Sequence, residues 1–349
     1  MRIGWVIYGA LDQATGGYIY DRLVIDHLRA CGDMVRVIEL DPEPRSRIAS
    51  AVGLVARMPG LDVIVGDELC HRELLLAFPA LRMRVGRALL IHHLRAWEMP
   101  RGPWRRLVSL AEIGAIGSSD VLLATSFTTS ERLRIEHGVR GVEVAVPGAD
   151  RLDVRPRRVS SAIRLVFVGS LIPRKRVLEL LLALERARDP RLELSLIGDD
   201  ARDRSYAARV REAVRTSPFL RDRVRFRGRL SDGALADALA EAGALVLPSS
   251  LEGYGMVLTE AVRAGVPVIA ARVGAVGEVV RDGAEALLFD SEPELVDALR
   301  RFANDAELRA KMQAAAEARA PSLPTWRATG EAVRSALSRA ALLGRRRSP

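Results

Sequence analysis

The chain has 349 residues, more than a single hydrophobic core usually organises, so we expect two domains. Its 49% hydrophobic and 28% charged residues are typical of a globular protein, and no apolar run approaches the roughly 20 residues of a membrane span. The net charge of +9 suggests an anionic partner. However, only Lys175 and Lys311 among the 53 basic residues are lysines, so the excess of arginine points to a compositional bias.

The start of the chain and its cysteines indicate a cytoplasmic protein. A strand begins directly at Arg2, without a charged leader or cleavage site, so we do not expect secretion. Cys31 and Cys70 are too few for a disulfide framework and lack zinc-site spacing, which predicts free thiols.

The first half of the chain alternates buried apolar strands with amphipathic helices. Strands are predicted at 2–8, 34–40, 62–66, 88–92, 121–125 and 142–146, and helices at 17–30, 46–57, 71–77, 104–117 and 127–137. This alternation predicts an α/β domain with a parallel sheet over residues 1–155. The turn-rich stretch 147–162 is expected to be a linker. A second α/β domain is predicted over 163–321, followed by a last helix at 325–343.

Residues 244–270 show the pattern of a phosphate site. The apolar run 244–247 predicts a buried strand, 248–255 a glycine-bearing loop, 256–264 a helix and 266–270 the next strand. The free N–H groups and the dipole at the start of such a helix favour an anion. Glu252 and Glu260 suit hydroxyl groups better than phosphate, so a ligand with sugar, diphosphate and ribose in series fits this layout.

The run Glu252-Gly-Tyr-Gly-Met-Val-Leu-Thr-Glu260 resembles the Glu-x7-Glu donor-site signature of the family-4 retaining glycosyltransferases. The segments 164–175, 192–198 and 224–232 are similar to strands and loops of the second domain of that family. The resemblance is specific over about residues 160–290 and looser over 1–150. It implies the GT-B fold, in which two Rossmann-like parallel-sheet domains face a central cleft. The donor would bind residues 163–321 and the acceptor residues 1–155, with the last helix packing back on the first domain.

The resemblance also implies roles in the donor site. Glu252 would bind the hydroxyl groups of the donor sugar, Lys175 the donor phosphates and Glu260 the ribose. Further donor contacts are expected from the backbone of Gly169, Gly198, Gly253, Tyr254, Gly255, Met256, Leu258 and Thr259. Ser170 stands where many members of the family have an arginine, which leaves Arg174 as a second cation. The alternatives are a solvated Lys175 at a helix start, a solvated loop residue for Glu252 and a helix-start acid for Glu260.

Three features of the first domain are expected beside the donor or the acceptor. Gly16 and Gly17 resemble the N-terminal glycine pair of the family, although a helix cap is the alternative. His92 and His93 follow a buried strand at the edge where parallel sheets bind ligands. The family has an active-site histidine here, for which we choose His92, with His93 as the alternate and a structural histidine as the competing interpretation. Asp67 is expected to face the acceptor.

Other ligands are excluded or left open by the motifs. The dinucleotide G-x-G-x-x-G fingerprint and the P-loop are absent, and no metal or cofactor is expected. Seven arginines and two tryptophans fall within residues 82–106, a pattern that suits an anionic membrane surface as well as a solvated face. No nucleic-acid module accompanies this charge.

These observations predict a metal-independent, retaining glycosyltransferase. It would use a nucleoside diphosphate sugar, most plausibly a UDP- or GDP-sugar, in cell-envelope glycolipid or polysaccharide synthesis, in the cytoplasm or on the inner face of the membrane. A nucleotide-sugar epimerase or hydrolase, or a catalytically silent nucleotide-binding partner, would share the same donor loops.

Overall fold

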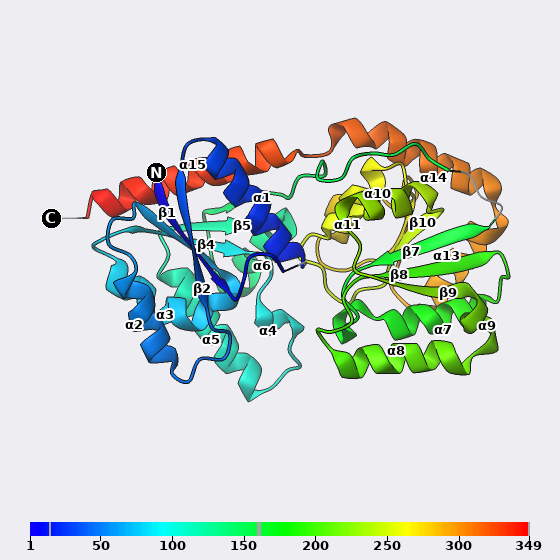
Figure 1. The fold of residues 1–349 in the computed structure, drawn as a ribbon, viewed down its shortest axis with the longest axis horizontal. Coiled ribbons are helices and arrows are strands. Elements are labelled where there is room, and N and C mark those ends of the chain that lie inside the picture. The colour runs from blue at the N-terminus through cyan, green and yellow to red at the C-terminus, as the bar shows by residue number, and fades with distance from the viewer. Residues whose placement is uncertain (14, 159–161, 348–349) are drawn as a thin grey trace. The chain divides into compact units, whose positions relative to one another are not determined.

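The computed structural model describes residues 1–13, 15–158 and 162–347 and divides the chain into two compact units. The first unit consists of Met1–Pro147 and Thr325–Pro349, and the second of Gly148–Pro324. Each unit is built on one six-stranded sheet whose paired strands are all parallel (Figure 1). No helix of the described chain is long and apolar enough to cross a membrane.

The sheet of the first unit has the strand order β2-β1-β3-β4-β5-β6. Its strands β1 and β3 are buried almost throughout, because helices cover both faces of a parallel sheet. The strands are β1 (Arg2–Tyr8), β2 (Met34–Leu40), β3 (Val63–Asp67), β4 (Gly86–Ile91), β5 (Val121–Ala124) and β6 (Val142–Val144). The helices are α1 (Gly16–Ala30), α2 (Arg47–Ala56), α3 (His71–Leu81), α4 (Arg95–Glu98), α5 (Pro103–Gly117) and α6 (Phe127–His137), with the 3-10 turn η1 (Glu68–Cys70).

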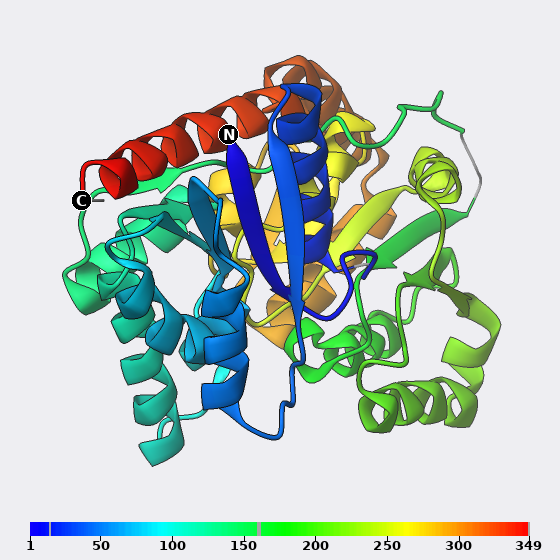
Figure 2. The ribbon, with the colours of Figure 1, turned by 60° about the vertical axis from the view of Figure 1, so that its left-hand side comes forward.

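The last helix, α15 (Trp326–Arg345), packs against α1 and β4 of this unit (Figure 2). Thr329 donates a hydrogen bond to the carbonyl of Val146 over 2.7 Å. The backbone of α15 lies directly on the start of β4, since a Cβ added at Gly86 would stand 2.2 Å from the carbonyl oxygen of Ala340. Glycine at position 86 is therefore required for this close approach.

The sheet of the second unit has the order β12-β11-β10-β7-β8-β9, the doubly wound Rossmann arrangement. Its strands are β7 (Ile163–Val168), β8 (Leu192–Ile197), β9 (Val224–Gly228), β10 (Ala244–Leu247), β11 (Val268–Ala271) and β12 (Ala286–Phe289). The helices are α7 (Val177–Ala187), α8 (Arg204–Thr216), α9 (Pro218–Arg223), α10 (Asp232–Glu241), α11 (Met256–Arg263), α12 (Val276–Val279), α13 (Glu292–Asn304) and α14 (Ala306–Arg319), with the 3-10 turns η2 (Pro173–Lys175) and η3 (Ala320–Ser322).

The predicted strands of the first half are all present, whereas one helix boundary was wrong. The helix expected to end at residue 77 continues through Pro79 to Leu81. Phe78 and Leu81 are fully buried, and their packing offsets the one backbone hydrogen bond that Pro79 cannot donate. The short helix α4 was not predicted. The expected linker 147–162 falls partly on residues 159–161, outside the described residues, and residues 148–158 lie in the second unit.

Candidate donor and acceptor sites

The second unit brings two loops together where its strand order reverses. β7 and β10 are neighbours in the sheet, but their following helices lie on opposite faces of it, as in other doubly wound sheets. Ligands of such sheets bind at this point, beyond the carboxyl ends of the strands. The loop after β7 carries Gly169, Arg174 and Lys175, and the loop after β10 carries Glu252 and Gly255.

A buried ion pair joins the two loops. The Lys175 ammonium group donates a hydrogen bond to Glu252 over 2.6 Å. Arg174 lies 3.9 Å from the other oxygen of the same carboxylate and donates to the carbonyl of Leu251 over 2.6 Å. Burial raises the pKa of Glu252, but Lys175 and Arg174 outweigh that effect and hold its pKa below the ordinary value. The carboxylate is therefore ionised, and Glu252, only 6% exposed, is not a solvated loop residue.

Glycines allow the backbone of these loops to pack closely. A Cβ at Gly198 would stand 2.0 Å from the carbonyl oxygen of Gly169. Gly274 has a φ of +51°, and a Cβ there would stand 2.0 Å from the carbonyl oxygen of Glu252. The same carbonyl accepts a hydrogen bond of 3.0 Å from Ala275. The 274–275 segment thus fixes the backbone that carries Glu252.

Helix α11 begins at the end of the Glu252 loop. Gly255, with a φ of 89°, is its N-terminal cap residue and provides no side-chain cap. The Leu258 N–H donates to the carbonyl of Gly255 over 2.8 Å, so Met256 and Val257 carry the first-turn N–H groups that remain for an anion. The Leu258 side chain is fully buried, and the Thr259 hydroxyl donates to the carbonyl of Met256. Tyr254 is also buried.

The structure adds Arg151 to this region, a residue that the sequence did not indicate. Its guanidinium group contacts Glu260 over 2.7 Å through Nη2 and 2.9 Å through Nε, and it also pairs with Asp232. The expected ribose-binding carboxylate is therefore already paired. Arg151 lies in the stretch taken for a linker, and nothing in its local pattern distinguishes it from the many other arginines.

A second polar cluster lies at the carboxyl edge of the sheet in the first unit. Asp67 ends β3, His92 follows β4, and Asp21 lies on α1. The Nε2 atom of His92 is 3.9 Å from Asp21 and 4.0 Å from Asp67. A Cβ at Gly17 would stand 3.4 Å from the His92 ring, so the glycine loop passes beside this histidine. The sheet order places β1 beside β3 here, again at a reversal point.

Burial controls protonation in this cluster. Desolvation lowers the pKa of His92 to about 3, with a small contribution from His93, so the imidazole is neutral. Desolvation also raises the pKa of Asp67 to about 7 and that of Asp21 well above its ordinary value. Glu68 is buried as well and accepts a hydrogen bond from the backbone N–H of His92 over 3.1 Å. The raised pKa values of Asp21 and Asp67 favour their protonated forms, which reduces the negative charge buried in this cluster.

The donor atoms of Asp21, Asp67 and His92 lie within 4.8 Å of one another, close enough to hold a metal ion. Protonation of Asp21 or Asp67 would reduce the negative charge of this group, as a bound metal ion would. His93 is turned elsewhere, since its Nε2 contacts Glu98 at 2.7 Å on α4. Of the two histidines, only His92 therefore joins the Gly17 loop and Asp67.

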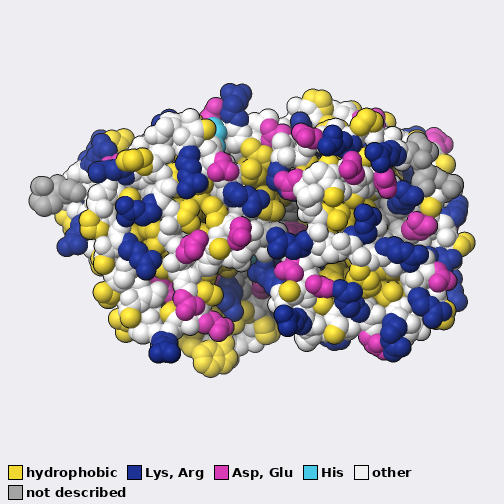
Figure 3. Space-filling view, in the orientation of Figure 1, with side chains coloured by type: hydrophobic (Ala, Val, Ile, Leu, Met, Phe, Trp, Pro, Cys, Tyr) yellow, Lys and Arg dark blue, Asp and Glu magenta, His cyan; other side chains and the backbone are white. Residues whose placement is uncertain are grey.

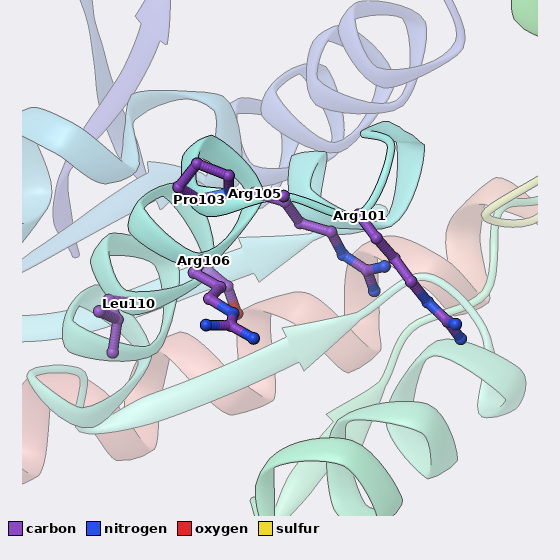
Figure 4. A pocket seen from close by; sticks show the side chains of 7 residues that line it. Arg101, Pro103, Arg105, Arg106 and Leu110 are labelled. Carbon is purple, nitrogen blue, oxygen red and sulfur yellow. The ribbon is translucent and has the colours of Figure 1, made fainter.

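The basic window of residues 82–106 divides into buried and exposed parts. Arg87 is buried against Asp120 at 2.7 Å, and Trp97 stacks under Arg132 at 4.1 Å, so neither belongs to an open surface. Along α5, by contrast, Trp104, Leu107 and Leu110 are 74%, 56% and 65% exposed. A groove beside them is lined by Arg101, Arg105 and Arg106, whose side chains extend from the α5 region in Figure 4. On the face shown in Figure 3, basic side chains are interspersed with acidic ones and form no continuous stripe.

Comparisons with known proteins place the chain among the glycosyltransferase folds. A sucrose-phosphate synthase from Thermosynechococcus elongatus superposes with a TM-score of 0.81 at 20% identity, covering 96% of this chain and 97% of that one. Anabaena HepE, solved in complex with UDP-glucose, gives a TM-score of 0.80 at 19% identity, covering 97% and 99%. With the two parallel sheets, these likenesses confirm the predicted GT-B fold.

The family resemblance is confirmed at the level of sequence. Residues 152–319 match the family described as "Glycosyl transferases group 1". A D-inositol 3-phosphate glycosyltransferase from Streptomyces avermitilis is 32% identical over 228 residues, which cover 59% of this chain and 49% of that protein. This chain thus spans about half the length of that relative. Residues 152–319 are thus similar to the group 1 glycosyl transferases, which supports the resemblance drawn from the Glu-x7-Glu motif.

Proposed function

We propose that this protein transfers a sugar from a nucleoside diphosphate sugar to an acceptor hydroxyl, with retention at the anomeric carbon and without a metal. The observation that carries the proposal is the convergence of Lys175, Arg174 and Glu252 beside the start of α11. A diphosphate fits the two cations and the helix N-terminus, while Glu252 suits the hydroxyl groups of a sugar. HepE, whose fold is shared, was solved with UDP-glucose, which makes that donor the first to test.

The reaction breaks the bond between the anomeric carbon and the diphosphate oxygen and forms a bond from that carbon to the acceptor oxygen. Negative charge develops on the leaving diphosphate, where Lys175, Arg174 and the amides of α11 stabilise it. The leaving oxygen takes the proton of the acceptor hydroxyl on the same face of the sugar, which retains the configuration. These side chains fill the role that a metal ion plays on a diphosphate elsewhere.

Binding of nucleotides is the first expected result. Saturating UDP, GDP or their sugars should raise the melting temperature, because a ligand at 100 times its Kd stabilises the native state by about 2.7 kcal/mol. The largest thermal shift among UDP, GDP, ADP and the corresponding nucleotide sugars would identify the base of the donor nucleotide. Turnover with the stabilising donor should then persist in EDTA, whereas its loss would show that the reaction needs a metal ion, for which Asp21, Asp67 and His92 are candidate ligands. A protein that no nucleotide stabilises would contradict the proposal.

Product analysis separates the rival activities. A donor incubated alone yields free sugar with a hydrolase, an epimeric sugar with an epimerase and neither with a transferase. A nucleotide-binding protein without turnover on any acceptor would be the silent partner. Acceptors for the assay are envelope glycolipids, polysaccharide fragments and phosphorylated polyols, the last because the Streptomyces relative is named for inositol phosphate.

The exposed surface of α5 around Trp104, Leu107 and Leu110 supports the proposal that the enzyme docks from the cytoplasm on the inner face of the membrane. Its exposed apolar side chains lie beside three arginines, and such surfaces gain about 1 kcal/mol per basic residue near anionic headgroups. The protein should float with vesicles containing phosphatidylglycerol, and the triple variant Trp104→Ala/Leu107→Ala/Leu110→Ala should not. Met34→Ala/Ile48→Ala/Val52→Ala, which removes equally exposed apolar groups of the same unit, is the matched control. Equal flotation of both variants would exclude this surface.

A further inference from the structure

We propose that Arg151 is a positioning residue of the donor site, which holds the carboxylate of Glu260 in the orientation that a ribose requires. The proposal rests on the proposed function, because it concerns how the same nucleotide is held. Arg151 lies outside the Glu-x7-Glu segment and outside both loops described above.

The contacts make Arg151 a clamp on one oxygen of Glu260. Nε and Nη2 of Arg151 both reach Oε1, and the side chains of Arg151 and Glu260 are only 7% and 5% exposed. Two donors of a rigid, planar guanidinium group fix the direction of a carboxylate more strictly than one donor does. The remaining oxygen of Glu260 is then held at a defined angle to the helix.

The position of Glu260 on α11 gives this clamp its significance. Glu260 is the fifth residue of α11, and in the proposed function the N–H groups at the start of this helix bind the diphosphate. Fixing its carboxylate therefore fixes the spacing between the ribose contact and the diphosphate contact. A third group, Asp232 at the start of α10, holds the opposite side of the Arg151 guanidinium group. Arg151 consequently has little freedom to turn away from Glu260.

Arg151 also favours the ionised form of Glu260. Burial raises the pKa of Glu260 and the negative charge of Asp232 adds to that rise, whereas Arg151 opposes it without bringing the pKa back to its ordinary value. Arg151 and Asp232 are the charged groups that face Glu260. Without the guanidinium charge, Glu260 would keep its proton to a higher pH and accept hydroxyl hydrogen bonds less well.

The test measures nucleotide affinity against pH. Calorimetry with UDP and GDP is carried out between about pH 6 and pH 9 on the wild type, Arg151→Met and Arg151→Lys. Arg151→Met should weaken the better nucleotide by about tenfold or more near neutral pH, and the deficit should shrink as pH rises. Arg151→Lys keeps the positive charge but loses the pair of guanidinium donors that contact Glu260. Its nucleotide affinity should therefore be weaker than that of the wild type, and the difference should depend little on pH.

The control removes a comparable arginine that touches no carboxylate. Arg157 in the same unit donates to the carbonyls of Leu239 and Ala242 over 2.8 and 2.6 Å. Arg157→Met should lower thermal stability without changing the pH profile of binding. Arg151→Met with wild-type affinity and profile would overturn the inference, and so would a loss of affinity that is independent of pH and equal in Arg151→Lys. If the wild type itself bound none of UDP, GDP and ADP, the proposed function would fail instead.

Discussion

Replacing Glu252 by alanine should lower kcat/KM for the sugar donor by about 10²-fold or more, and replacing Lys175 by alanine should have an effect of similar size. The Glu252→Ala variant would lose the hydrogen bonds to the donor sugar, and the Lys175→Ala variant would lose the positive charge that stabilises the leaving diphosphate. Because the two groups are 2.6 Å apart, each substitution also leaves the partner buried without its counter-charge. Steady-state kinetics with the identified donor measures both effects.

The double variant and a surface pair complete this experiment. Glu252→Ala/Lys175→Ala should be less impaired than the product of the single effects, since the two side chains act as one unit. Arg164 and Glu241 in the same unit pair at 2.9 Å on a much more exposed surface, so Glu241→Ala should leave kcat/KM unchanged. Turnover that survives Glu252→Ala undiminished would remove the donor site from this place.

The ion pair between Lys175 and Glu252 explains how the loops after β7 and β10 can keep two charged groups buried side by side. Lys175 and Glu252 neutralise each other, which avoids two isolated charges in a buried place. In the proposed function, the donor phosphate would replace Glu252 as the partner of Lys175, and the hydroxyl groups of the sugar would replace Lys175 as the partner of Glu252. Both groups would then stay paired, so binding would create no uncompensated charge.

The sequence predicted the parts of the fold and site that local patterns define. The parallel strands follow from apolar runs, and Lys175 stands out as one of two lysines. The link between Lys175 and Glu252 depends on the adjacency of β7 and β10, whose paired residues Leu165 and Ala244 are 79 positions apart. Only the family resemblance indicated this adjacency. Rare residue types and motif spacing thus drew attention to the two loops, and their role in binding a donor stays a prediction.

The missed residues depend on tertiary contacts that carry no local signal. Arg151 meets Glu260 from 109 positions away, in a chain rich in arginine. Asp21 had no motif and gains its importance only because α1 brings it to His92. Asp67, expected to face the acceptor, is 3% exposed and caps η1 by accepting from the Leu69 N–H over 2.7 Å, and its role beside an acceptor stays a prediction. A carboxylate at a strand end can face inward or outward, and the packing of α1 decides which.

Replacing His92 by alanine should lower kcat by about 10²-fold, whereas His92→Gln should retain more activity, because a neutral hydrogen-bonding group is what the site uses. Burial lowers the pKa of His92 to about 3 from 6.5, so the pH–rate profile of the wild type should show no step near 6.5. Since its folded pKa is depressed, stability from the neutral ring is present above 6.5 and is lost as pH falls toward 3. An activity step near 6.5 that His92→Gln abolishes would show that the ring ionises during turnover.

Asp67 acts on stability in the opposite direction, which separates its contribution from that of His92. Its folded pKa of about 7 lies above its ordinary 3.8, so its stabilising effect is complete below 3.8 and is lost as pH rises to about 7. Asp67→Asn should therefore gain unfolding free energy relative to the wild type between those pH values in urea titrations. Asp26→Asn, an exposed acid on the same helix as Asp21, should change nothing. Equal pH dependence in wild type and Asp67→Asn would mean that Asp67 is already ionised in the folded protein. His92 would then face a buried negative charge, which favours its protonated form and contradicts a neutral ring.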